Sequence, residues 1–515
     1  MNAEIETLLV DLDRADIKLW LDGEKLRFNA PENALTSELR ERLQAVKPEL
    51  MTRLQQANVD SSEKNLPFLQ GNTIPPSFAQ QHFGGLQLRN PSVCYYNVPF
   101  GFQLEGELNV ELLTQSFNRI IERHDFLRTT LENNNGDLQQ IITPYQPQQT
   151  VVNMTVIHVD NLIDRATVLQ KHLDIECLTP FNLAVESSLR VRLLQFSQNN
   201  AVLLLCVHNV LFDMGALRAL LHELQEQYHA LVTQQSCSLP ALPMQYVNCV
   251  RWQRALLSES ALQPRLVYWR KWFKRGEPPQ VTFAIAGKNE PATTFDAGTC
   301  WCEISPELTQ ALKDLSQQTG VTFFNTILAA YALVLKRHSG YDDIVLGTTF
   351  ANRNHWKLEP VIGSLLNILA LRFDFTDNLD VISLLKRTRE TVLIATEQQA
   401  VPFLTIAPFL FPDQPRTTPL FRTVFSFLGE LSKHDVLLLE NMQVTFMEDI
   451  HGAFMFPDLY PTIWERTTDE GGMLIGCWQY KRGFIAEETV KSMIISFQQI
   501  LTAMVTNPTQ TLDNL

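Results

Sequence analysis

The first 57 residues alternate between helical and strand-like spacing of apolar side chains. Apolar residues recur at helical intervals at Ile5, Leu8, Leu9 and Leu12, which predicts a short helix from Ile5 to Arg14. The following stretch, IKLWLDGEKLRF, alternates apolar and polar residues on both sides of Asp22 and Gly23. An Asp-Gly pair at such a centre is a strong signal for a tight β-hairpin, because both central positions of its turn need positive φ angles.

A turn at Asp22 and Gly23 sets the expected faces of this hairpin. Leu19 is then expected opposite Leu26 and Ile17 opposite Phe28, so that the apolar side chains share one face. The other face is expected to carry a partly basic, aromatic set, namely Lys18, Trp20, Lys25 and Arg27.

The rest of the chain divides into three further parts by its pattern. A second helix is expected to begin at Thr36 or Ser37, which can cap it, and to be kinked or restarted at Pro48. Residues 58–75 lack periodicity and contain Pro, Gly, Ser and Asn, which indicates a linker. Helical and strand patterns then alternate to the end, with a Pro- and Gly-containing break at 278–298, which predicts an α/β protein with lobes at 76–277 and 278–515.

One buried strand ends in a group of polar residues. The run AVLLLCV is almost continuously apolar and follows Asn199-Asn200, so we expect it to be a central strand reached through a hairpin. It delivers His208 and Asn209 at its end, and a short loop leads through Asp213 to an amphipathic helix. Loops at the ends of strands commonly hold active sites, so these residues are the first candidates for chemistry.

Composition excludes several classes of function. The net charge of -14 argues against a nucleic-acid binder, which needs clustered Lys and Arg. The chain has no apolar run of 18 residues and begins with an acidic stretch rather than a signal peptide, so we expect no membrane partner and a cytoplasmic protein. Its eight cysteines never form a CxxC, and we expect reduced thiols, including those of Cys300 and Cys302.

No metal or nucleotide motif is present in the sequence. His222, Glu223 and His229 do not form HExxH, and their spacing fits the exposed side of a helix, so we predict no metal site. A G-x-S-x-G, a Walker A sequence and a dinucleotide fingerprint are all absent, which argues against hydrolase, nucleotide and nicotinamide chemistry.

Residues 208–214, HNVLFDM, resemble the HHxxxDG motif of nonribosomal peptide synthetase condensation domains. Further segments resemble the family's other motifs in the family's order: SFAQQ at 77–81, RHDFLRTTL at 123–131, YVNCVRWQR at 246–254, YWRKW at 268–272, GTTFANR at 347–353, IGSLLNILALR at 362–372, QQAVPF at 398–403 and PLFRTVFSF at 419–427. Asn209 stands where the family has its second His, Met214 stands where it has Gly, and 398–403 lacks the usual His and Asp.

This resemblance implies an α/β fold of two chloramphenicol-acetyltransferase-like lobes that form a V with a central tunnel. It also implies a candidate catalytic set, namely His208, Asn209, Asp213, Met214 and Gly215. In the family the Asp makes a buried ion pair with an Arg beneath the site, and Arg128 and Arg353 match motif positions that could supply it. The heterocyclising and epimerising branches fit poorly, because His208 replaces the first Asp of DxxxxD and Asn209 replaces the second His.

The N-terminal run LWLDGEKLRFNAPENALT is similar to TubC-type docking domains. Such domains bind the C-terminal peptide of an upstream synthetase protein beside the hairpin, which implies a peptide site at Lys18, Trp20, Lys25 and Arg27. Strand addition at an exposed sheet edge is the physical mode that this predicts. The resemblance further implies donor and acceptor carrier proteins as partners, a downstream adenylation domain, and substrates presented on phosphopantetheine arms, with no cofactor bound directly.

Three functions remain open at the level of sequence. The first is condensation of an upstream acyl or peptidyl thioester with a downstream carrier-bound amine. The second is a non-catalytic domain that binds carrier proteins or recruits a tailoring enzyme. The third is an enzyme with changed chemistry, such as a different acceptor nucleophile or dehydration. The Asn at position 209 is what keeps them open, because an amide cannot exchange a proton near neutral pH.

Overall fold

The computed structural model divides into two compact units, residues 1–70 and 71–515. The structure describes residues 8, 18–22, 25–29, 37–47, 74–94, 96–134, 137–147, 152, 154–159, 164–208, 212–257, 259–273, 281, 283, 297–353, 355–402, 405, 410, 421–431, 437, 439–447, 450, 457–468 and 471–514. The predicted helix Ile5–Arg14 and linker 58–75 fall outside this set, except for Leu8, Ile74 and Pro75.

In the first unit, strands β1 (Lys18–Asp22) and β2 (Lys25–Asn29) form the predicted antiparallel hairpin. Its register differs from the expected one: Leu19 lies opposite Phe28, and Asp22 pairs with Lys25. Asp22 is therefore a strand residue and not a turn residue, and this register places an acidic residue directly across from a basic one. Helix α2 (Ser37–Ala45) ends before Pro48, which cannot continue it.

The first half of the second unit is built on a five-stranded sheet with the order β13-β3-β8-β7-β6. Its strands are β3 (Asn97–Gly106), β6 (Met154–His158), β7 (Leu189–Ser197), β8 (Asn200–His208) and β13 (Met442–Met447). Its helices are α5 (Val110–Arg123), α6 (Arg165–Leu178), α7 (Met214–Val232) and α8 (Tyr246–Leu256), preceded by a π-helical turn (Gln80–Gly84) and α4 (Gly85–Arg89). Helix α9 (Glu259–Trp272) packs instead with Val345, Ala370 and Val424 of the second half. Strands β4 (Thr129–Asn134) and β5 (Asp137–Ile142) form a separate hairpin.

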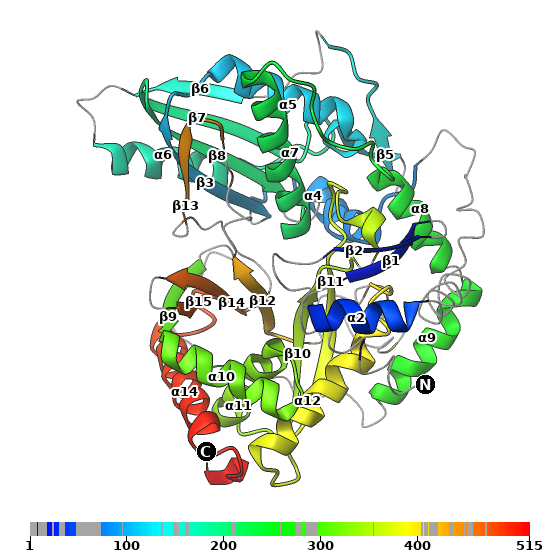
Figure 1. Ribbon diagram of the computed structural model, residues 1–515, viewed down its shortest axis with the longest axis vertical. Coiled ribbons are helices and arrows are strands. Elements are labelled where there is room, and N and C mark those ends of the chain that lie inside the picture. Colours follow the sequence, from blue (N-terminus) through cyan, green and yellow to red (C-terminus); the bar gives the residue numbers. More distant parts are fainter. Residues whose placement is uncertain are drawn as a thin grey trace. The chain divides into compact units, whose positions relative to one another are not determined.

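Alternation along β8 assigns its two faces to different helices. Residues 201–208 are all buried, as expected for a central strand. Leu203 and Leu205 pack in the core that includes α5 and α7. Val202 and Leu204 pack with Leu169 of α6 in a second cluster, so α6 covers the opposite face of the sheet (Figure 1).

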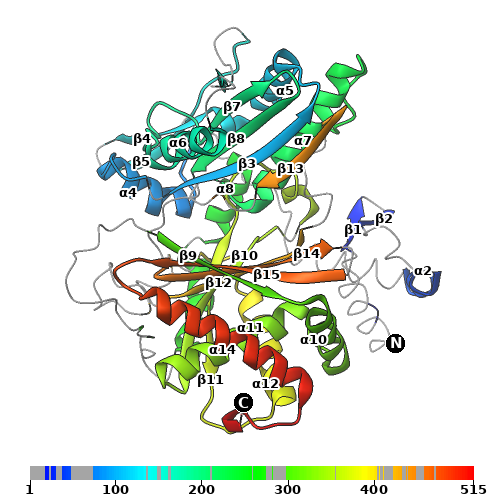
Figure 2. The same cartoon turned by 90° about the vertical axis from the view of Figure 1, so that its left-hand side faces the viewer.

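The second half carries a six-stranded sheet with the order β11-β10-β12-β14-β15-β9. Its strands are β9 (Ala297–Ile304), β10 (Asp343–Phe350), β11 (Asn367–Asp374), β12 (Val424–Leu431), β14 (Leu459–Thr468) and β15 (Gly471–Lys481). Helices α10 (Pro306–Thr319), α11 (Phe323–Ser339), α12 (Val381–Thr396) and α14 (Glu487–Thr506) lie on one face of it (Figure 2). Within this sheet β10, β12 and β14 run parallel, and the remaining pairs are antiparallel.

Side-chain caps explain where several helices begin. The side chains of Asn109, Asp164, Ser305, Thr322 and Asp380 accept hydrogen bonds from the first turns of α5, α6, α10, α11 and α12. Gly320 and Gly340 end α10 and α11 in the left-handed conformation that glycine adopts without strain. These caps fix the residues at which the helices begin or end.

Strand β13 departs from a division into two sequential lobes. It lies far along the chain yet pairs antiparallel with β3, with Val444 opposite Leu104, and completes the sheet of the first half. Val444 is buried in the core of that half. A boundary near 278 therefore stays a prediction, and the second half contributes a strand to the first.

Candidate active site

Asp213 occupies the N-cap position of α7, five residues after the end of β8. Its side chain is 3% exposed. The Oδ1 atom accepts hydrogen bonds from the Ala216 amide at 2.7 Å and from Nη2 of Arg353 at 2.8 Å. The Oδ2 atom accepts from the backbone amides of Leu365 and Leu366 at 2.7 and 3.0 Å. Four N–H donors thus satisfy this buried carboxylate, and they come from both halves of the unit.

Arg353 is the partner that the structure selects for Asp213. Its side chain is 8% exposed, and its guanidinium also donates to the carbonyl oxygens of Leu358, Val361 and Gly363 at 2.6, 2.8 and 3.0 Å. A buried charge with this many partners holds the surrounding loops in one arrangement.

Two backbone features make room for Arg353. The preceding residue, Asn352, has a φ of +52°, a left-handed conformation that asparagine tolerates. The Nε, Cδ and Cζ atoms of Arg353 lie against Gly215, where any Cβ would collide with them. Gly215 of the candidate set is therefore required by packing, and it lies one residue after the position where the family motif has its glycine.

Arg128, the other candidate partner of Asp213, binds elsewhere. Its Nη2 pairs with Asp125 at 2.5 Å, and its Nε donates to the Ile121 carbonyl at 3.0 Å. Arg128 therefore closes the C-terminal end of α5, where unpaired carbonyls need donors. Its guanidinium is occupied by these groups and does not form the ion pair with Asp213.

His208 is completely buried on the face of β8 that α6 covers. Its ring lies 5.4 Å from the Tyr96 ring and 5.7 Å from the Phe181 ring, centroid to centroid. Neither ring nitrogen has a hydrogen-bond partner among the described residues. Burial, with a smaller contribution from the Arg190 charge, lowers the pKa of His208 to about 3, so the imidazole is neutral near pH 7.

The remaining two candidates differ in what the structure describes. Asn209 lies outside the described residues, together with 210 and 211. Met214 is the first residue of α7, is partly buried and packs against the core of the first half.

Other family-like segments converge on the same region. Tyr246 donates from its hydroxyl to the Ser364 carbonyl at 2.9 Å, and its ring occupies the space beside Gly363, whose φ of +145° only glycine adopts readily. Asn367 donates to the carbonyls of Gln399 and Val401 at 2.6 and 2.8 Å, which fastens the segment 398–403 to the start of β11.

The N-terminal motif segments are joined in the same way. Arg254 donates to the Pro76 carbonyl at 3.0 and 2.7 Å and to Gln81 at 2.7 Å, and its guanidinium lies over the Phe78 ring. Segment 77–81 is thereby held against α8.

The predicted docking residues lie in the hairpin of the first unit. Trp20 is opposite Arg27, Lys18 opposite Asn29, and Asp22 opposite Lys25. By strand alternation positions 18, 20, 25 and 27 still share one face, because the register differs from the predicted one by a whole two-residue period.

Within the described part of the chain, no group of three or more His, Cys, Asp or Glu side chains could hold a metal ion. His222 and His229 are exposed on α7, as predicted, but Glu223 is buried and pairs with Arg123 and His124 at 3.0 and 2.9 Å. The described helices include no single one that is long and apolar enough to cross a membrane. Among pairs of described helices, α10 and α11 together are long and apolar enough to cross a membrane, by length and composition alone, and they are bent by 106°.

A cavity of about 530 Å³ lies at the other end of α7, lined by Glu226, His229 and Glu440 among others. Sixteen residues separate His229 from Asp213 on this helix, which is about 24 Å at 1.5 Å per residue. This cavity is therefore distinct from the Asp213 region.

Sequence reasoning missed several groups that shape this region. The amides of Leu365 and Leu366 belong to a segment noticed only as a family match. Asn97 and Arg190 were not singled out, although Arg190 and Arg192 alternate within an otherwise apolar strand. Charged residues at alternate positions of a buried strand are a signal for buried partners on one face.

Comparisons with known proteins agree with the motif series. Residues 70–515 match the Condensation domain family, and residues 5–56 match the TubC N-terminal docking domain. Malpinin synthetase of Mortierella alpina is 30% identical over 445 residues, covering 86% of this chain. Malpibaldin synthetase of the same organism is 30% identical over 442 residues, covering 85% of this chain. The chain spans only 6% and 8% of the lengths of these two relatives.

Two solved structures show the same fold at low identity. The X-domain from teicoplanin biosynthesis has a TM-score of 0.76 at 20% identity and covers 87% of this chain and 98% of its own. The condensation domain of the Monacolin K polyketide synthase MokA has a TM-score of 0.73 at 18% identity and covers 85% of this chain and 99% of its own. The α/β fold is thus chloramphenicol-acetyltransferase-like, and the chain belongs to the condensation domain family of nonribosomal peptide synthetases, with a TubC-type docking domain at its N-terminus.

Proposed function

We propose that residues 71–515 catalyse amide formation between two carrier-bound substrates in the cytoplasm. The amine nitrogen of the acceptor attacks the thioester carbonyl carbon of the donor. A C–N bond forms, the C–S bond breaks, and the amine proton ends on the thiol of the donor's phosphopantetheine arm. Both substrates are delivered on such arms from opposite sides of a central tunnel, and the domain holds no cofactor of its own.

The observation that carries this proposal is the complete framework around Asp213. Its carboxylate joins the start of α7, Arg353 and the amides of Leu365 and Leu366 into one buried network of four N–H donors. The network fixes the start of α7 four residues after Asn209, and β8 ends at His208, the residue before Asn209. Such a framework supports a site that works by positioning its substrates.

Asn209 changes the chemistry at the centre of this site. An amide side chain can accept a hydrogen bond from the amine or donate one to the developing oxyanion, but it cannot take up a proton. Loss of a general base typically costs about 10²–10⁴ in rate. Holding two reactants in line can contribute about 7–11 kcal/mol, which exceeds that loss, so weak but real acyl transfer is expected.

The docking unit supplies the donor in this proposal. The C-terminal peptide of an upstream synthetase protein binds beside the hairpin at Lys18, Trp20, Lys25 and Arg27, and brings its carrier protein near residues 71–515. A downstream adenylation domain and its carrier then supply the amine.

The competing function is a domain that binds carrier proteins or recruits a tailoring enzyme without forming a bond. Asn209 and Met214 favour it, since both depart from the family motif. A third function, changed chemistry at the same site, shares the framework but delivers the acyl group to another nucleophile.

Intact-protein mass spectrometry of two loaded carriers, with and without the domain, separates these functions. If positioning dominates, the wild type transfers the acyl group to the amine and Asn209→His changes the rate only modestly. If a base has been lost, Asn209→His raises turnover, alone or together with Met214→Gly. Carrier binding by calorimetry with no transfer by wild type, Asn209→His or the double variant, across a panel of aminoacyl carriers, would eliminate the condensation proposal.

A further inference from the structure

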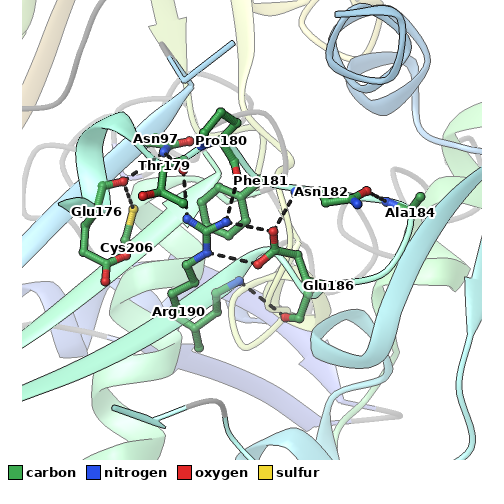
Figure 3. Close-up of polar contacts among 12 residues, drawn as sticks. Asn97, Glu176, Thr179, Pro180, Phe181, Asn182, Ala184, Glu186, Arg190 and Cys206 are labelled. Carbon is green, nitrogen blue, oxygen red and sulfur yellow. Dashed lines mark hydrogen bonds and ion pairs between the residues drawn. The ribbon is translucent and has the colours of Figure 1, made fainter. Parts of the chain in front are cut away.

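A buried polar cluster lies behind the end of β8, on the face covered by α6 (Figure 3). Cys206 and His208 point to this face by strand alternation, and the Cys206 thiol contacts the Glu176 carbonyl at 3.6 Å. Asn209, a candidate catalytic residue, follows His208 directly in the chain. A contact that holds His208 therefore holds the end of β8 next to Asn209.

Among the described residues, ring packing holds the His208 side chain. Its neutral imidazole is fully buried, and no described residue forms a hydrogen bond with either nitrogen. The Phe181 ring meets it edge-on, with an interplanar angle of 88°, and the Tyr96 ring lies 5.4 Å from it, centroid to centroid. The positions of Phe181 and Tyr96 thus set the position of the His208 ring.

Arg190 in turn holds Phe181. Its guanidinium carbon lies 3.9 Å from the centre of the Phe181 ring, a close cation–π contact. The guanidinium is itself fixed by a two-pronged pair with Glu186, at 3.0 and 2.7 Å, and by the carbonyls of Thr179 and Pro180 at 2.9 and 2.8 Å. Figure 3 shows Arg190 at the centre of these contacts.

Asn97 fixes the same segment from the neighbouring strand. It lies directly opposite His208 in the β3–β8 ladder. Its side-chain amide donates to the carbonyls of Glu176, Cys177 and Thr179 at 2.9, 3.2 and 2.7 Å, at the end of α6. The segment that carries Phe181 is therefore held by Asn97 and by Arg190, which both donate to the Thr179 carbonyl.

We propose that Arg190 is a positioning residue, which acts through Phe181 and His208 to fix the end of β8, the residue before Asn209. This inference rests on the proposed amide-forming function. Arg190 touches no substrate in it. Because reacting groups must be aligned closely, a displacement of about 1 Å in a catalytic group can cost up to about 10²-fold in rate.

Arg192 provides a matched control two residues along β7. It pairs with buried Glu176 at 2.6 Å, and its side chain is 16% exposed against 14% for Arg190, but no ring contact joins it to Phe181 or His208. Arg190→Lys and Arg192→Lys thus each weaken one largely buried arginine–glutamate ion pair on the same strand face. Only Arg190→Lys also disturbs the stacked rings.

The test compares amide formation from loaded carriers by the two variants at equal folded fraction. We expect Arg190→Lys to lower kcat about tenfold without changing KM for either carrier, and Arg192→Lys to change kcat less than about twofold. Phe181→Leu, which removes the ring, should repeat the effect of Arg190→Lys. Equal losses in the Arg190 and Arg192 variants would overturn the proposal.

A second readout does not depend on turnover. NMR of histidine-labelled protein reports the His208 ring directly, through ring-current shifts from Phe181. Arg190→Lys should move these resonances and Arg192→Lys should leave them in place; unchanged resonances in both variants would also overturn the proposal. A wild type without amide formation contradicts the proposed function, and the resonances then decide the positioning role by themselves.

Discussion

Asp213 and His208 stand five residues apart, yet the two side chains meet opposite surroundings. Four N–H groups hydrogen-bond to the Asp213 carboxylate, whereas no hydrogen bond from a described residue reaches the His208 ring. Hydrogen bonds and an ion pair hold the Asp213 carboxylate, whereas packing against other rings holds the His208 ring. Replacing the His208 ring by an apolar ring of similar size removes two polar atoms that lack hydrogen bonds and keeps the ring contacts.

His208→Phe should therefore be no less stable than the wild type at pH 7 and should flatten its response to acid. An unfolded imidazole titrates near 6.5, whereas the pKa of folded His208 is about 3. Between these values the unfolded chain binds more protons, so this group makes the free energy of unfolding fall as pH falls, by at most about 1.4 kcal/mol per pH unit. This pH-dependent loss of stability is absent above about pH 6.5 and is complete below about pH 3.

Urea unfolding at pH 4.5, 5.5 and 7 measures this difference. The exposed His222, changed to Gln, serves as the control for removal of a histidine from the chain. A loss of more than about 2 kcal/mol at pH 7 in His208→Phe would mean that the imidazole makes a hydrogen bond after all.

Single residues also mark what the sequence could and could not predict. The buried strand and the ion pair of Asp213 with an Arg were both predicted, the first from apolar patterning and the second from the family resemblance. The choice of Arg353 over Arg128 was not, because both occupy matching motif positions and only tertiary structure brings one of them to Asp213. Glu223 was expected on an exposed helix side, but its ion pair with Arg123 and its contact with the His124 ring at 2.9 Å allow its burial.

At the scale of elements, the motif segments form hydrogen bonds that join neighbouring helices, strands and connecting segments. Asn367, the first residue of β11, donates hydrogen bonds to two backbone carbonyls of the segment after α12. The hairpin of the first unit shows the limit of local prediction. Alternation of apolar and polar residues predicted which positions share a face. The cross-strand pairs depend on where the turn begins, and the turn begins one residue later than predicted, so every pair differs from the predicted one.

Asn367→Ala should loosen the segment 397–402 while leaving the six-stranded sheet intact. The variant loses two hydrogen bonds to backbone carbonyls and should be destabilised by about 1–3 kcal/mol. Hydrogen exchange measured by mass spectrometry should rise in peptides that cover 397–402 and not in those that cover β10. Asn378→Ala, in the exposed loop beyond the other end of β11, is the control. Unchanged exchange at 397–402 would show that other contacts hold the segment.

At the scale of the whole molecule, residues distant in sequence complete each other's structure. β13 extends the sheet of the first half, and Arg353 and residues 365–366 satisfy a carboxylate of that same half. Patterning along the chain predicted two sequential lobes but not this exchange, because a strand's partner is decided by tertiary packing rather than by its own sequence. The second half therefore cannot be altered around 353–366 without affecting the start of α7.

The docking unit offers a test at this scale that leaves the condensation unit unchanged. Lys18→Glu with Arg27→Glu should weaken binding of the upstream protein's C-terminal peptide at least about tenfold, because both positions lie on the predicted binding face of the hairpin and charge complementarity sets partner choice. Arg40→Glu with Lys47→Glu makes the same change in net charge on exposed positions of α2 or just after it, and should alter affinity little. Calorimetry with the peptide at 50 and 300 mM salt gives both comparisons, and melting curves confirm that each variant folds. The affinity of the wild type should fall with salt more steeply than that of the hairpin variant, since screening acts on charges that the variant lacks. Equal weakening by both pairs would reveal a general charge effect, and no weakening by the hairpin pair would remove the peptide site from this face.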